Sequence, residues 1–162
     1  NYLGIDQSPD VLGVARRNIE STFANGQRPV ENVMLTAYDI EKIAAILDET
    51  NDRVSRIYIN FCNPWPKARH HKRRLTHTLQ LLKYRKLLCD NGEIWFKTDN
   101  DDLFLATLRY MEEAGFEVTE KTFDLHAEND SENIESEHEV MFTAQGIKTK
   151  ALKARMLPSV SK

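Results

Sequence analysis

Residues 56–67 of the chain, RIYINFCNPWPK, join an apolar stretch to a stiff loop. Arg56–Phe61 is rich in the β-branched and aromatic residues typical of strands. Pro64 and Pro66 then restrict the backbone to extended conformations. The segment therefore predicts a strand that ends in a rigid loop.

Strand and helix patterns alternate on both sides of this segment. Apolar runs predict strands, and helical spacing with capping residues and glycine stops predicts helices. Because strands alternate with helices, we predict an α/β fold with a mainly parallel sheet and helices on both faces. The expected strands are residues 2–5, 33–38, 56–61, 93–98, 116–123 and 140–144, and the expected helices are residues 9–26, 40–47, 71–88 and 101–114.

Three further expectations concern the predicted elements. The inner face of the helix at 71–88 is assigned to Leu75, Leu79, Leu82 and Leu87. Residues 127–136 read as a polar loop, and the order of the basic tail, residues 148–162, stays open. Since a strand starts at residue 2 with no lead-in, we expect residues 1–162 to be a single domain whose first part lies upstream of Asn1.

The composition is that of an ordinary globular protein. The 162 residues carry a formal net charge of -3, and 41% of them are hydrophobic. No apolar run approaches the roughly 20 residues that a bilayer requires. Cys62 and Cys89 match no metal-ligand spacing, so we expect free thiols in a reducing cytoplasm.

Polar side chains follow four successive predicted strands: Asp6, Asp39, Asn63 and Asp99. In open α/β sheets, ligands bind outside the carboxyl ends of the strands. Each carboxylate also has a purely structural interpretation, since Asp6 belongs to a helix start and Asp39 and Asp99 precede helices that they could cap. The alignment of all four favours a ligand crevice.

A dense basic segment follows the proline loop. Residues 67–74 read KARHHKRR, with five Lys or Arg and two His. Such a run is usually a solvated helix face. Its position after a rigid loop at the strand ends favours phosphate binding and therefore nucleic acid. His70, His71 and His77 lack the spacing of zinc ligands, and no metal site is expected.

The motifs resemble those of the bacterial tRNA (guanine-N7)-methyltransferases. The resemblance rests on NPWPKARHHKRRL at 63–75, FKTDN at 96–100 and SEHE at 136–139 followed by Phe142. It covers essentially the whole chain in order and spacing. It implies a class I Rossmann-like methyltransferase fold with an antiparallel C-terminal strand, S-adenosylmethionine as methyl donor, and methylation of a guanine N7 in the variable loop of tRNA.

The resemblance also assigns roles to individual residues. Asp6, Asp39 and Asn63 fall at cofactor contacts, and Asn63 and Asp99 at catalytic positions. The expected substrate contacts are Lys67, Asp99, Ser136, Glu137, His138 and Glu139, and the expected RNA contacts are Arg69, His70, His71, Lys72, Arg73 and Arg74.

Three departures from the family pattern accompany these assignments. Asn63 stands where the family usually has Asp, and an amide cannot act as a base. Ser136 and His138 replace the usual Thr and Tyr. The family's Gly-rich loop, which holds the methionine end of the cofactor, would lie upstream of Asn1.

Two other functions are compatible with parts of this sequence. One is a non-catalytic RNA-binding module on a degenerate methyltransferase fold, and the other is a methyltransferase of the same fold that acts on a small molecule or a protein. The basic segment beside the expected crevice argues against the second. The sequence does not decide between a monomer and a homodimer.

Overall fold

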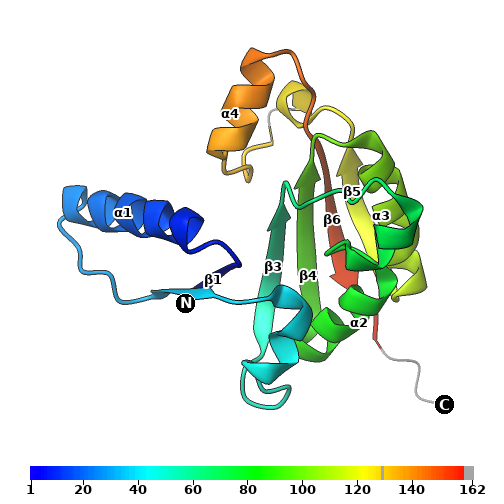
Figure 1. The fold of residues 1–162 in the computed structure, drawn as a ribbon, viewed down its shortest axis with the longest axis horizontal. Coiled ribbons are helices and arrows are strands. Elements are labelled where there is room, and N and C mark those ends of the chain that lie inside the picture. Colours follow the sequence, from blue (N-terminus) through cyan, green and yellow to red (C-terminus); the bar gives the residue numbers. More distant parts are fainter. Residues whose placement is uncertain (129, 159–162) are drawn as a thin grey trace. The chain divides into compact units, whose positions relative to one another are not determined.

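The computed structural model describes residues 1–128 and 130–158, and the chain forms two compact units, residues 1–46 and 47–162 (Figure 1). The first unit contains β1 (Tyr2–Asp6), α1 (Pro9–Asn25), β2 (Val33–Ala37) and the 3₁₀ helix η1 (Ile40–Ala45). The second contains β3 (Val54–Asn60), η2 (Ala68–Arg73), α2 (Thr78–Leu87), β4 (Leu88–Thr98), α3 (Asp101–Glu113), β5 (Phe116–Thr122), η3 (Leu125–Glu128), α4 (Glu137–Ala144) and β6 (Lys150–Met156).

In the first unit, β1 and β2 pair in parallel from Tyr2 opposite Val33 to Asp6 opposite Ala37. The helix between them starts where the sequence predicts, because the Ser8 hydroxyl accepts a hydrogen bond from the Val11 N–H at 3.4 Å. Asp39 caps η1 in the same way, accepting from the Glu41 N–H at 3.0 Å. The short helix predicted at 40–47 is present as this 3₁₀ helix.

The second unit is built on a four-stranded sheet in the order β3-β4-β6-β5 (Figure 1). The β3–β4 pair is parallel, and β6 runs antiparallel to both β4 and β5. Helix α3 packs on β4, β5 and β6 through Leu103, Phe104 and Met111, which are fully buried. The α/β class and the antiparallel C-terminal strand are confirmed, and this sheet is mixed, where a mainly parallel one was expected, because β6 pairs antiparallel with both of its neighbours.

The antiparallel strand lies at different residues from those predicted. Residues 140–144, predicted as a strand, belong to α4, because Ser136 and Glu139 form a capping box that starts a helix at Glu137. The strand is β6, inside the basic tail whose order stayed open. Alternate β6 residues, including Leu152 and Ala154, are buried as a sheet face requires. Residues 129 and 159–162, which belong to the predicted loop and tail, lie outside the described residues.

The long helix predicted at 71–88 is broken into η2 and α2. The break follows from Arg74 and Thr76, which turn inward: Arg74 is 3% exposed, and the buried Thr76 hydroxyl hydrogen-bonds that of Thr107 at 2.7 Å. Helix α2 therefore starts afresh at Thr78 and buries a different face. Leu79 and Leu82, expected inside, are 56% and 45% exposed, whereas Leu87 is buried as predicted, together with Leu81 and Tyr84.

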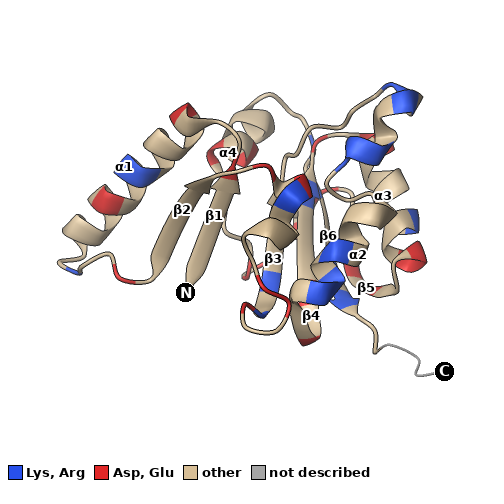
Figure 2. Cartoon of the chain, turned by 60° about the horizontal axis from the view of Figure 1, so that its bottom comes forward, with Lys and Arg blue, Asp and Glu red and all other residues tan. Residues whose placement is uncertain are grey.

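Charge is unevenly distributed between elements. Basic and acidic residues alternate along α1, whereas α2 carries Lys and Arg without Asp or Glu (Figure 2). No acidic residue occurs in the sequence between Asp52 and Asp90. The basic character therefore extends beyond residues 67–74 to the end of α2. No helix among the described residues is long and apolar enough to cross a membrane.

Candidate substrate-binding and catalytic site

The loop after β3 is held in one conformation by its own side chains. Phe61 and Trp65 have left-handed backbones, with φ of +50° and +43°. The Asn63 side-chain oxygen accepts a hydrogen bond from the Trp65 N–H at 3.0 Å, and the Arg74 Nε donates to the Pro64 carbonyl at 2.8 Å. Because two independent bonds fix the loop, the exposed Asn63 side chain has a defined position at the end of β3.

The basic segment is organised around Trp65. The Arg73 guanidinium lies 4.1 Å from the centre of the Trp65 ring, and His70 meets that ring edge-on at 5.6 Å. Arg69 donates to the His70 ring at 3.3 Å. Such contacts orient cationic side chains without neutralising them. Lys67, Arg69, Lys72 and Arg73 are exposed, whereas Arg74 is buried against the loop.

A buried ion pair joins β4 to the first turn of α4. Lys97 donates to the Glu139 Oε2 at 2.9 Å, to the Ile134 carbonyl at 3.0 Å and also to the Asn133 side chain. Glu139 is fully buried. Burial opposes its ionisation, but hydrogen bonds from Lys97, the Ser136 N–H and Asn133 outweigh that effect and hold the pKa of Glu139 below its ordinary value. Glu139 is therefore an anchor of α4.

The rest of the predicted substrate segment lies beside the end of β3. His138 stacks on Phe61 with ring centres 5.5 Å apart and meets Phe142 edge-on at 5.6 Å. The Ser136 hydroxyl accepts from the Glu139 N–H at 3.3 Å. The contacts of His138 and Glu139 place α4 beyond the arrowheads of β3 and β4 (Figure 1). Within the predicted substrate segment, Ser136–Glu139, only Glu137 and His138 are exposed.

Asp99 lies at the same sheet edge as the Asn63 loop. The Phe61 N–H donates to the Lys97 carbonyl at 2.9 Å, so the chain leaves β3 and β4 side by side. The Asp99 backbone carbonyl accepts from Lys150 at 2.9 Å, and Asn100, not Asp99, caps α3. Among the described residues the half-buried Asp99 carboxylate has no hydrogen bond or ion pair. It is therefore available to a ligand.

Asp6 and Asp39 share the carboxyl edge of the first unit's parallel pair. The Asp6 carbonyl accepts from the Tyr38 N–H at 3.0 Å, which places the two carboxylates on adjacent chain segments. Asp6 uses one carboxylate oxygen to accept from the Ser8 N–H at 2.7 Å. Carboxylates at this edge fit the hydroxyls of a nucleoside. Their convergence with Asn63 and Asp99 stays a prediction.

Sequence reasoning missed two groups of residues. Lys97 belongs to the FKTDN motif but had no predicted role, and its partner Asn133 belongs to none of the predicted motifs. Arg109 and Asp102 of α3 also lie outside the predicted motifs. Within the described residues, no cluster of three or more His, Cys, Asp or Glu side chains is arranged to hold a metal ion.

Solved structures define the class of the fold. The chain is similar to an rRNA methylase from Streptococcus thermophilus (TM-score 0.59, 13% identity, 96% of this chain and 73% of that one). It is also similar to the N-methyltransferase NodS from Bradyrhizobium japonicum WM9 (TM-score 0.60, 11% identity, 96% and 73%). A structure described as "a putative methyltransferase complexed with SAH" aligns at a TM-score of 0.60 and 12% identity over 95% of this chain and 38% of that one. The fold is that of class I methyltransferases.

The sequence comparisons identify the family. Residues 1–152 match the family model described as "Putative methyltransferase". A tRNA (guanine-N(7)-)-methyltransferase of Clostridium botulinum (strain Eklund 17B / Type B) is 55% identical over 152 residues, 94% of this chain and 69% of the relative. One of Clostridium perfringens (strain 13 / Type A) is 52% identical over 157 residues, 97% and 71%. The chain belongs to the tRNA (guanine-N(7)-)-methyltransferase family, and the resemblance noted in the sequence is confirmed.

Proposed function

We propose that this protein transfers a methyl group from S-adenosylmethionine to N7 of a guanine in the variable loop of tRNA. The observation that carries the proposal is the identity of about half of all residues with enzymes named for this reaction. The unpaired Asp99 carboxylate supports it, because Asp99 lies at the same sheet edge as the NPWP loop, residues 63–66 after β3. A non-catalytic module is disfavoured, because the relatives that match 94% or more of this chain are named as enzymes.

The reaction needs little acid–base catalysis. Guanine N7 has a lone pair in the base plane and no proton to lose at neutral pH. S-adenosylmethionine, when bound, supplies an electrophilic methyl group. The protein's task is then to position the guanine and to stabilise the positive charge that develops on the purine. This explains why Asn63 can replace a carboxylate.

Asp99 is the proposed partner of the guanine. Its carboxylate can accept hydrogen bonds from N1–H and the exocyclic amine, which fixes the orientation of the base. Its negative charge also favours the cationic product. The exposed Glu137 and His138 lie at the same edge and can complete the contact, while Ser136 and Glu139 act by holding the segment in place.

Asp6, Asp39 and Asn63 are the proposed cofactor residues. The Asn63 oxygen accepts from the Trp65 N–H and keeps a second lone pair, so the side chain can accept from the cofactor through its oxygen as well as donate through its nitrogen. Lys67, Arg69, Lys72 and Arg73 are exposed and suited to backbone phosphates, which supply affinity rather than base choice. Cys62 and Cys89 are free thiols, in keeping with a cytoplasmic location.

Single-turnover methylation of tRNA that lacks N7-methylguanine tests the role of Asp99. We expect Asp99→Ala and Asp99→Asn to slow methyl transfer by on the order of 10²-fold, as for loss of a preorganised electrostatic partner. The exposed Glu117 on β5 provides the matched control, and Glu117→Gln should react at the normal rate. Unchanged rates in both Asp99 variants would remove this residue from the mechanism.

A further inference from the structure

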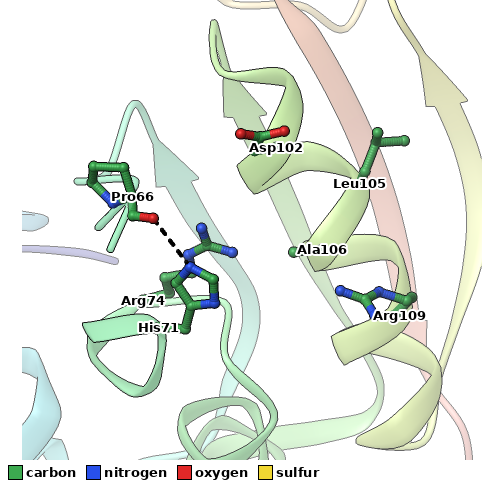
Figure 3. A pocket seen from close by; sticks show the side chains of 7 residues that line it. All are labelled: Pro66, His71, Arg74, Asp102, Leu105, Ala106 and Arg109. Atoms are coloured by element: carbon green, nitrogen blue, oxygen red, sulfur yellow. Dashed lines mark hydrogen bonds between the residues drawn. The ribbon is translucent and has the colours of Figure 1, made fainter. Parts of the chain in front are cut away.

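A hollow of about 360 Å³ lies between the NPWP loop with η2 on one side and α3 on the other (Figure 3). The loop and η2 contribute one wall and α3 the other. The lining residues are Pro66, His71 and Arg74, facing Asp102, Leu105, Ala106 and Arg109. The α3 residues of this hollow belong to none of the motifs that predicted RNA contacts.

Arg74 brings an uncompensated charge to this hollow. Only 3% of Arg74 is exposed, and its Nε donates to the Pro64 carbonyl. Its two terminal nitrogens have no hydrogen bond or ion pair within residues 1–128 and 130–158. The guanidinium points into the hollow (Figure 3). Since a buried, unpaired cation is costly, an anion in the hollow would complete the arrangement.

Arg109 adds a second free cation on the facing wall. It is exposed and forms no ion pair with any described residue. His71 lies on the other side of the hollow, where its Nε2 is 3.4 Å from the Pro66 carbonyl. Two arginines against one carboxylate give the hollow a net positive charge, which favours an anion.

Asp102 does not repel an anion that is bound beside Arg109, because the two residues lie far apart along α3. It lies seven residues before Arg109 on α3, so about 10 Å of helix axis separates them. Leu105 and Ala106 lie between them on the same helix face and form an apolar wall. An RNA backbone offers groups that match this order: a phosphate, the apolar side of a ribose and a 2′-hydroxyl donor.

We infer that the hollow binds a phosphodiester of the RNA backbone, with the phosphate between Arg74 and Arg109 and Asp102 near the adjoining ribose. The inference rests on the proposed function, because tRNA is the polyanion in question. It adds α3 to the RNA-binding surface. It also distinguishes Arg74 from the exposed cations of η2, because Arg74 contacts a phosphate from inside the hollow.

Arg109 is the residue to change, since Arg74 also holds the loop through Pro64. The matched control is Arg17 on α1, which is exposed and forms no ion pair with any described residue. Binding of tRNA is measured over a range of NaCl concentrations for the unaltered protein, Arg109→Gln and Arg17→Gln. Ethylation interference on the same tRNA then reports which single phosphates the protein needs.

We expect Arg109→Gln to weaken tRNA binding several-fold and to reduce the slope of log K against log[NaCl] by about 0.7–0.9, the range for one lost phosphate contact on a single strand or a duplex. One ethylation-sensitive phosphate should disappear, while Arg17→Gln retains the full pattern. If Arg109→Gln keeps both the slope and all interference positions, the site is refuted, whatever the protein methylates. If the phosphate is lost but the unaltered protein transfers no methyl group, the site stands and the proposed function fails.

Discussion

Removing the Lys97 ammonium tests whether the ion pair with Glu139 anchors α4 to the sheet. The Lys97 side chain is 11% exposed and that of Glu139 0%, so Lys97→Met leaves a carboxylate buried without its counter-ion. Breaking such a pair from one side costs about 3–5 kcal/mol. Two donors to Glu139 survive, Asn133 at 3.1 Å and the Ser136 N–H at 3.1 Å, so we expect the lower end, about 3 kcal/mol.

Urea unfolding followed by tryptophan fluorescence measures this free energy, since Trp95 in β4 is 9% exposed and lies two residues before Lys97. The matched variants are Glu139→Gln and the double variant. Because each single change leaves the other side chain without its partner, we expect a coupling free energy of about 2 kcal/mol between the two positions. Effects that add to within about 0.5 kcal/mol would refute the anchoring role.

The same pair predicts a dependence on pH. Folding lowers the pKa of Glu139 below its ordinary value of 4.5, so its contribution is fully present above that pH and is lost as pH falls through the folded-state pKa. The stability of the unaltered protein should therefore approach that of Glu139→Gln as the solution is acidified below 4.5. A gap that stays constant or widens would contradict the assignment.

Three further outcomes are expected. Asn63→Asp should retain methylation activity within a few-fold, because a carboxylate accepts the Trp65 N–H as well as the amide does; loss of activity would show that the amide nitrogen is needed. Cys62 should react slowly with iodoacetamide at pH 8, because burial raises its pKa to about 11 and leaves about one thiolate in a thousand; rapid labelling would show that the thiol is accessible. Gly92→Ala should lower the free energy of unfolding by about 1–3 kcal/mol, because its Cβ would lie 2.8 Å from the Cys89 carbonyl; unchanged urea unfolding would count against this crowding.

The sequence predicted the elements whose signals are local. The helix start at Ser8 and Pro9 and the strand that ends before the NPWP loop follow from capping and proline chemistry, and both are present. The helix at Glu137 also had a local signal, Ser136 with Glu139 three residues on, but the apolar residues after it favoured a strand. Here the cap determines the outcome.

Other features depended on contacts distant in sequence. The break between η2 and α2 arises because Arg74 bonds Pro64 and Thr76 bonds Thr107, neither of which has a periodic signature. Glu139 was expected to contact substrate because it belongs to a motif, yet it is buried in α4 against Lys97 of β4, which is distant in sequence. A motif identifies conspicuous residues, but burial decides whether they hold the site together or face the ligand.

The methylated nucleoside itself provides the most direct test. The protein is incubated with methyl-labelled S-adenosylmethionine and tRNA from cells lacking N7-methylguanine, and the tRNA is digested and analysed by mass spectrometry. The account predicts label in N7-methylguanosine alone, at one guanine of the variable loop. Label in any other nucleoside, or tRNA bound tightly but never labelled, would contradict it.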